Sequence, residues 1–491
     1  MLLANGLIGP SIPWTDILPL LILLGGACFL LLVGSLVPNW PRHGYAWFTG
    51  ATAAAALVAN CVQWNNLYSK VGRSIIADAI FVDRFSVLAS ITVLGAVIFS
   101  SILMSAYLQR SQDDGPELFA LFLTAAIGAI VMISANDLIV MFLGLEVLSL
   151  SLYLLAASNR RREQSQESGI KYFVLGGFAS AFFLYGIALV YGSTGSTQLF
   201  VNQSLPQGIA QSLGSQVTVN GNDSLLLIGI GLLMIGLAFK VSAVPFHVWA
   251  PDVYEGSPSM TTATMSTLAK VVAMATLFKL LDVLNADIDY KFQIVVVVIS
   301  ILSMTVGNIM ALRQKNVKRM LAFSGVSHAG FMLMALLSMT TAASTLLYYT
   351  AAYALAGIAS FAVIIYVTKD KDNEDIINFN GLGKTNPLLA AVLTASLLSM
   401  AGIPIFSGFF AKFILFTQTI KAGYMVVVIA AVINSIISVG YYFKLILAMY
   451  TKEASEDRKA VPFVYYAVAV IAILLNIAMG IYPSFVTNLL N

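Results

Sequence analysis

Four ionisable side chains lie near the middle of long apolar stretches of this 491-residue chain: Glu146, Lys240, Lys270 and Lys412. A charge at the centre of a bilayer costs at least about 2.5–3.5 kcal/mol, so such residues are seldom kept for packing alone. Burial disfavours the ionised form of each group, whereas a nearby opposite charge favours it. Opening and closing a contact between a buried acid and a buried lysine would therefore release and capture a proton. These residues predict a proton path, with Glu146 as the partner of Lys240.

A static ion pair that only locks two helices together is the alternative interpretation of Glu146 and Lys240. Such a pair would leave Lys270 and Lys412 without acidic partners. We therefore favour proton transfer over a purely structural role.

His328 is a further candidate for the same path, and His247 and Lys171 are weaker candidates. His328 lies in RMLAFSGVSHAGF and His247 in AVPFHVW. An imidazole titrates near neutral pH and can relay protons between lysines, although a single histidine in a helix is often only a packing residue. Lys171 begins an apolar stretch and is ambiguous. Lys279 and Lys444 lie near the ends of apolar stretches, where long side chains carry their charge to the membrane interface.

The composition indicates a membrane protein along the whole chain. Hydrophobic residues make up 59%, charged residues only 10%, and the mean hydropathy is +0.88. A soluble domain carries about 25% charged residues. The N-terminal segment MLLANGLIGPSIPWTD has no basic region, so we expect no cleaved signal peptide. We expect Cys28 and Cys61 to be small buried hydrophobic residues.

Fourteen apolar stretches are long enough to cross a bilayer, which takes about 20 helical residues. They lie at roughly 17–37, 46–63, 84–107, 116–134, 137–157, 168–191, 225–249, 257–282, 291–312, 318–338, 344–367, 386–417, 424–449 and 461–485. The sequence thus predicts an all-α polytopic membrane protein with about 14 transmembrane helices.

Two of these helices contain residues that break a helix. Pro245 falls in the seventh span, and Gly402 and Pro404 fall in the twelfth. Proline removes a backbone donor and clashes one turn back, so both helices should unwind locally. Interrupted helices at corresponding places in two halves point to an inverted-repeat transporter. We expect N-terminal helices at 1–115, two inverted five-helix repeats at 116–282 and 283–450, and a last helix at 451–491.

The orientation follows from the loop lysines and arginines, which gather on the cytoplasmic side of membrane proteins. Most of them lie in loops after odd-numbered spans, such as Arg160–Arg162 and Lys315–Arg319. Both termini should therefore face outward. The connection at 192–224 has no lysine or arginine and should lie outside as a long loop or hairpin.

Six stretches make the chain resemble the antiporter-like membrane subunits of bacterial respiratory complex I and of related cation/proton antiporters. They are FLGLEVLSLSLYLL, ESGIKYFVLGGFAS, FKVSAVPFHVWAPDVYEGSP, TLAKVVA, NVKRMLAFSGVSHAGF and AGIPIFSGFFAKF. The likeness is strongest to the N-type branch, because of the KYF at Lys171–Phe173, the lysine at 412 and an end soon after the fourteenth span. Ile405 and Ala411 depart from the usual proline and glycine and alter only local backbone stiffness.

The resemblance implies a role for each candidate. Glu146 and Lys240 would form an ion pair, Lys270 would be the central relay, His328 a bridging group and Lys412 the residue near the outward exit. NADH, FMN, iron–sulfur clusters and quinone would belong to partner subunits, because this chain has no GxGxxG unit, Walker loop or cluster-ligand spacing. We expect no cofactor or metal in this chain.

The implied surroundings are the bacterial plasma (inner) membrane, other antiporter-like subunits and small proton-channel subunits, with no nucleic acid. The alternatives are a subunit of a multi-subunit Na⁺/H⁺ antiporter, a related proton-pumping complex with another electron donor, and a structural scaffold with frozen ion pairs.

Overall fold

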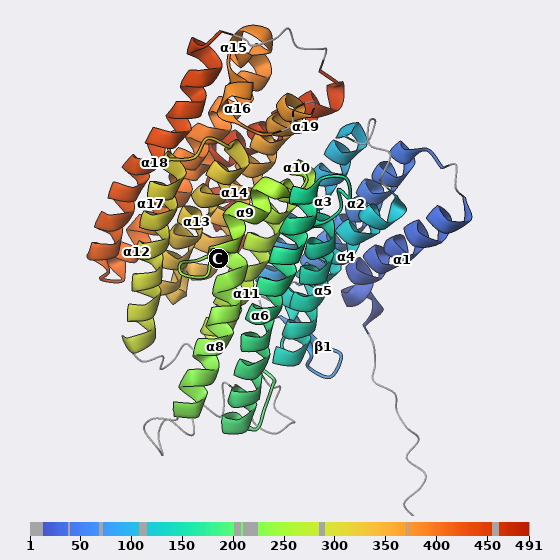
Figure 1. Ribbon diagram of the computed structural model, residues 1–491. Helices are drawn as coiled ribbons and strands as arrows, with labels where there is room; N and C mark the ends of the chain where they lie inside the picture. The colour runs from blue at the N-terminus through green and yellow to red at the C-terminus, as the bar shows by residue number, and fades with distance from the viewer. Residues whose placement is uncertain are drawn as a thin grey trace, which may run out of the picture.

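The computed structural model is a bundle of long, nearly parallel helices (Figure 1). It describes residues 13–37, 40–67, 72–107, 115–200, 208–209, 224–283, 290–369, 371, 373–453 and 461–490. Most of the 192–224 connection (201–207 and 210–223) lies outside the described residues, so its expected form stays a prediction.

The helices match the fourteen predicted spans. The uninterrupted ones are α1 (Trp14–Leu36), α2 (Arg42–Asn66), α3 (Arg84–Tyr107), α4 (Pro116–Ser134), α5 (Leu138–Ala156), α6 (Glu163–Thr194), α12 (Tyr290–Leu312), α13 (Val317–Met334), α14 (Met339–Thr368), α18 (Met425–Thr451) and α19 (Phe463–Ile481). Thirteen described helices are long and apolar enough to cross a membrane. A fourteenth, interrupted crossing is formed by α16 (Pro387–Ala401) and α17 (Ser407–Lys421).

The seventh span ends earlier than predicted. Its helix α8 (Ser224–Val241) stops eight residues before position 249, and α9 (Trp249–Gly256) follows after a turn. Pro245 therefore lies in the turn and not inside a helix. The eighth span carries an unpredicted irregularity, since α10 (Ser259–Thr264) and α11 (Lys270–Val283) are joined by the π-helical turn η1 (Met265–Ala269). Single π-helical turns of this kind often occur at functional sites.

The central helices are α10–α11, α13 and α14. In the apolar window of each span, 94% of residues in α10–α11, 100% in α13 and 89% in α14 are buried, against 28% in α1. Lys270 and His328 both lie on these central helices. The outer helices carry the exposed apolar residues that a bilayer would cover, and these include Cys28 and Cys61, which are exposed rather than buried as predicted.

The two ends of the bundle are closed by short loop contacts. At one end, strands β1 (Arg73–Ile75) and β2 (Ile80–Val82) form a hairpin that pairs with Ala135. At the other end, Asn316 pairs with Asp375, next to η3 (Ile376–Phe379) and α15 (Leu382–Thr385). The remaining short helices, η2 (Ala335–Leu337) and α20 (Ser484–Thr487), extend the hairpin end.

Glycines allow the closest helix contacts. A Cβ on Gly128 of α4 would lie 2.4 Å from the backbone nitrogen of Leu148 on α5, and one on Gly144 would lie 2.7 Å from that of Met132. A similar reciprocal pair, Gly186 and Gly229, joins α6 to α8, and Gly307 of α12 and Gly330 of α13 each approach the backbone of the other helix. Small residues drive helix association in lipid because backbones can then approach closely.

Gly128→Ala should destabilise the bundle, because its methyl group would meet backbone and not a movable side chain. We expect a loss of about 1–3 kcal/mol, as for other overpacked cores. Gly95→Ala on α3 is the matched control, since a Cβ there meets nothing within 4 Å. The thermal unfolding midpoint of each purified variant checks this, and equal midpoints for the two would contradict it.

Candidate functional site

Both interrupted helices end in the same backbone motif. After α8, the Ser242 amide donates to the Phe239 carbonyl and the Ala243 amide to the Ala238 carbonyl. After α16, the amide of Gly402 donates to Ser399 and that of Ile403 to Leu398, with the same spacing. These are Schellman ends, which need a left-handed residue just past the helix. Ser242 and Gly402 both have positive φ, 63° and 89°.

Lys270 binds the last carbonyl of the first broken helix. Its Nζ donates to the carbonyl of Val241, the final residue of α8, at 3.1 Å, and to that of Gly325 on α13 at 2.8 Å. Only 2% of Lys270 is exposed. The carbonyl end of a helix carries partial negative charge, which stabilises a cation there. The residue before Val241 is Lys240, so two buried lysines meet at this break.

Lys412 makes the equivalent contact at the second break. Its Nζ donates at 2.9 Å to the carbonyl of Ala401, the final residue of α16. The same Nζ lies 4.7 Å from the centre of the Phe331 ring on α13. A Cβ at Gly402 would lie 2.9 Å from Cδ of Lys412, so the glycine leaves the space that the lysine stem occupies.

Lys240 lies among aromatic rings. Its Nζ is 5.0 Å from the centre of the Tyr153 ring and 5.3 Å from that of Tyr172, and it donates to the Tyr153 hydroxyl at 3.4 Å. Tyr172 stacks on Trp249, with centroids 4.4 Å apart. A desolvated cation over such rings gains about 2 kcal/mol or more. These aromatic residues from α5, α6 and α9 therefore hold the buried ammonium group in place.

Glu146 is half-buried on α5 and accepts a hydrogen bond from the hydroxyl of Ser180 on α6. In the described part of the chain it makes no direct contact with Lys240, whose partner is Tyr153. Glu146 and Tyr153 lie seven residues apart, on one face of the helix. Direct pairing of Glu146 with Lys240 therefore stays a prediction, and Tyr153 is a residue that the sequence analysis missed.

His328 connects two tyrosines in the centre of the bundle. Its Nδ1 lies 2.9 Å from the Tyr349 hydroxyl and its Nε2 lies 3.2 Å from that of Tyr442, which in turn contacts the Ser324 hydroxyl at 2.5 Å. Each of these groups can both donate and accept. A proton can therefore pass along this row of hydrogen-bonded side chains when each hydrogen bond reverses its direction.

A cavity of about 10 Å³ adjoins His328 on the side of the second break. Ser399, Gly408 and Ala411 line it together with His328, and Ala411 directly precedes Lys412. A volume of about 10–15 Å³ is what one water molecule needs. His328 thus lies between Lys412 and Lys270; it shares α13 with Gly325, whose carbonyl binds Lys270.

The two weaker candidates lie away from this centre. Lys171 is 42% exposed and forms ion pairs with Glu167 at 2.6 Å and Asp252 at 3.4 Å. Asp252 also binds Arg319 at 2.7 Å, so Lys171 belongs to a charge network near the loops. His247 lies in the turn after α8, and its buried Nδ1 has no hydrogen-bond partner among the described residues.

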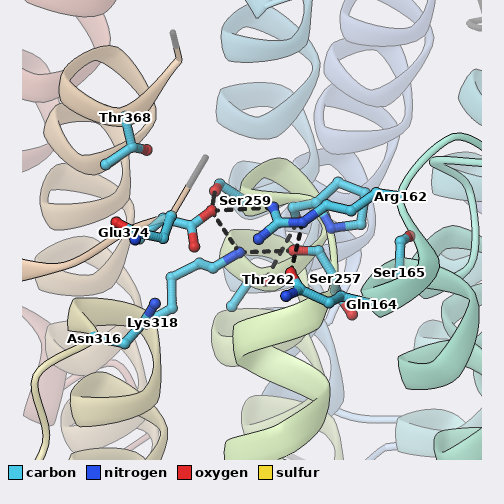
Figure 2. A network of polar contacts seen from close by, with 12 residues as sticks. Arg162, Gln164, Ser165, Ser257, Ser259, Thr262, Asn316, Lys318, Thr368 and Glu374 are labelled. Carbon is cyan, nitrogen blue, oxygen red and sulfur yellow. Dashed lines mark hydrogen bonds and ion pairs between the residues drawn. The ribbon is translucent and has the colours of Figure 1, made fainter. Parts of the chain in front are cut away.

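A buried ion pair near the loops was also missed. Lys318 and Glu374 lie 3.0 Å apart, with 0% and 6% of their side chains exposed, and Arg162 reaches the same carboxylate at 3.5 Å. Figure 2 shows these side chains converging from α13, the segment after α14 and the start of α6. The sequence analysis counted Lys318 among the loop lysines, where charges are ordinary, and did not single out Glu374.

The fold and the buried lysines define a polytopic membrane subunit built around two broken helices. Residues 135–438 match the family model described as "NADH:quinone oxidoreductase/Mrp antiporter, TM", and the chain belongs to this family. A protein from Flavobacterium johnsoniae named NADH-quinone oxidoreductase subunit N is 56% identical over 92% of this chain and 95% of its own length. Another of that name from Trichlorobacter lovleyi is 36% identical over 96% and 94%.

Solved structures give the same fold. A chain of respiratory complex I from Thermus thermophilus with bound aureothin superposes with a TM-score of 0.80 at 32% identity, covering 96% of this chain and 98% of that one. A chain of the Mrp complex from Dietzia superposes with a TM-score of 0.84 at 19% identity, covering 98% and 96%; at that identity the match shows the fold alone. The resemblance stated from the sequence is thereby confirmed.

Neighbouring glycines on α6 test the Tyr153–Lys240 contact. A Cβ on Gly176 would lie 1.9 Å from the Tyr153 hydroxyl, whereas one on Gly177 meets nothing within 4 Å. Gly176→Ala should therefore displace the hydroxyl and break its 3.4 Å contact with Lys240, and Gly177→Ala should leave it intact. Structures of the two variants check this, and an unchanged contact in Gly176→Ala would refute it.

Proposed function

We propose that this chain is the N subunit of a bacterial NADH–quinone oxidoreductase and moves protons across the membrane, coupled to quinone reduction elsewhere in the complex. The observation that carries the proposal is the row of buried lysines held at the two helix breaks. Lys270 and Lys412 each bind the last carbonyl of a broken helix, and His328 with its tyrosines lies between them.

The contacts suit reversible proton transfer. Carbonyl oxygens stabilise the ammonium groups of Lys270 and Lys412 in place of a carboxylate. Either lysine can therefore give up its proton without leaving a buried carboxylate unpaired. A strong buried ion pair would instead resist neutralisation, because removing one charge strands the other. Lys240, Lys270 and Lys412 would carry the proton, and His328 would relay it. Glu146 would control whether Lys240 is protonated, because it lies on the same face of α5 as Tyr153, which contacts Lys240.

The redox chemistry would belong to other subunits. NADH, FMN, iron–sulfur clusters and quinone are assigned to those partners, and this chain would contribute only translocation. Among the described residues, no group of three or more histidine, cysteine or acidic side chains could hold a metal ion. The other antiporter-like subunits and the small proton-channel subunits would flank it in the plasma membrane, with both termini outside.

The shared Schellman ends support two inverted repeats at 116–282 and 283–450. The motif ends a helix of the fourth span in each five-span unit, α8 in the first and α16 in the second, as expected if one unit is a copy of the other. Because each unit has an odd number of spans, the second copy runs the opposite way through the membrane. The Na⁺/H⁺ antiporter alternative is supported by the fold and by the family model, whose description includes the Mrp antiporter, whereas the relatives above 30% identity carry the quinone oxidoreductase name.

Lys270→Met should abolish most proton translocation in the assembled complex, because the side chain keeps its bulk and loses its proton site. We expect a fall of about tenfold or more in the initial rate of acidification of inverted membrane vesicles, within the range that positioned proton-transfer groups contribute. Lys240→Ala and Glu146→Ala should act in the same direction. The control is Lys444→Met, whose ammonium group contacts only the Gln314 carbonyl in an exposed setting among described residues.

Full pumping and quinone reduction in the Lys240→Ala and Glu146→Ala variants would support a structural scaffold instead. A rate that depends on Na⁺ and not on NADH would favour the antiporter alternative.

A further inference from the structure

A second buried acid lies at the loop end of the central helices. The carboxylate of Glu374 is 3.0 Å from Lys318, and both side chains are almost wholly buried. Two buried charges in contact are costly unless their remaining hydrogen bonds are satisfied. Here one carboxylate oxygen, Oε2 of Glu374, has no hydrogen-bond partner among the described residues, and neither has the hydroxyl of Ser257, whose carbonyl accepts from Lys318 at 2.8 Å.

Backbone pairing fixes the acid in this place. The Val317 amide donates to the Glu374 carbonyl at 2.7 Å, and the Ile376 amide donates to that of Lys315 at 2.9 Å. These bonds tie the segment after α14 to the start of α13. The position of Glu374 beside Lys318 is therefore built into the fold and does not depend on side-chain conformation alone.

A large polar pocket reaches the pair from the loop side. Its volume is about 540 Å³, and Glu374 and Ser259 are among its lining residues. The pocket lies at the loop ends of α6, α10 and α14, so it stands above the most buried helices of the bundle. Figure 2 shows Arg162, Ser259 and Lys318 directed at the Glu374 carboxylate.

The charges facing Glu374 are mostly positive. Lys318 contacts it from α13 and Arg162 from the start of α6. The other charged residues that line the pocket are Arg161, Glu163, Lys369 and Lys371. The second carboxylate oxygen, Oε2, is buried and has no hydrogen-bond partner among the described residues. Buried polar atoms without a protein partner are ordinarily satisfied by water.

The pair and the central lysine Lys270 both contact α13. Lys318 and Gly325 lie seven residues apart on one face of α13, about 10 Å along the helix axis. The Gly325 carbonyl binds Lys270. The distance between the pocket floor and Lys270 is therefore one that a short chain of water molecules can bridge.

We infer that Glu374 and Lys318 form the uptake site through which protons from the loop side reach Lys270. This rests on the proposed proton translocation. A hydronium ion in the pocket gives its proton to Glu374 and becomes water. Lys318 then lacks its counter-ion in a buried site and passes its proton, through water, to Lys270 in its neutral form, which becomes an ammonium group. The neutral Glu374 next transfers its proton to Lys318, which restores the ion pair. One proton has then moved from the pocket to Lys270, and Glu374 and Lys318 are as they were.

The test compares three forms of the assembled complex: Glu374→Gln, Glu374→Asp and the double variant Glu374→Gln with Lys318→Gln. An uptake site predicts that Glu374→Gln slows pumping by about tenfold or more, that Asp restores most of the rate, and that the double variant remains slow. A static ion pair predicts the reverse for the double variant: neither member of the fully buried pair is left as an unpaired charge, Arg162 is partly exposed to solvent, and pumping returns.

The amount of assembled complex in each membrane is measured in parallel. Failure of the double variant to assemble would assign the pair a structural role and overturn the proposal. Lys270→Met in the same preparation separates the two proposals. If Lys270→Met pumps slowly while the double variant pumps normally, the uptake site is rejected and the proposed function stands. If Lys270→Met pumps normally, the proposed function is rejected as well.

Discussion

The contact on which the structure depends is that between a buried lysine and the last carbonyl of a broken helix. Lys270 meets Val241 and Lys412 meets Ala401 in this way. Each contact satisfies two buried polar groups, a helix-end carbonyl and a lysine ammonium group. The Schellman end leaves carbonyls that lack intrahelical donors, and the lysine has no acidic neighbour at its depth. A charge-assisted hydrogen bond satisfies both groups, and it leaves the lysine able to exist without its proton.

The same contact explains why the central helices are arranged as they are. Gly325 brings α13 close enough for its carbonyl to bind Lys270, since a Cβ there would lie 3.1 Å from Cε of that lysine. Gly402 does the same for Lys412 at the second break. Between them, His328 and its tyrosines supply groups that donate and accept equally well. The apolar helices around this core isolate it from lipid, so the proposed proton transfer would be confined to one line of polar groups.

The sequence predicted the spans and the deep charges because a bilayer requires apolar helices of a minimum length and makes a charged side chain at its centre costly. It predicted the helix breaks from Pro245, Gly402 and Pro404, but not that the first helix ends as early as Val241. Tyr153 was missed because aromatic residues are common in apolar helices and only contact with Lys240 marks this one. Glu374 was missed because burial of a loop residue depends on backbone pairing between distant segments, which no local pattern reveals. The hydrogen bond from Ser180 to Glu146 was beyond local pattern for the same reason.

The most direct test of this account is a structure of the assembled complex at a resolution that shows ordered water. We expect that structure to show water molecules that join Lys240, Lys270, His328 and Lys412 into one hydrogen-bonded line. Both lysine–carbonyl contacts should be in place at the two breaks. An unbroken apolar barrier between Lys270 and Lys412, or lysines turned away from Val241 and Ala401, would contradict it.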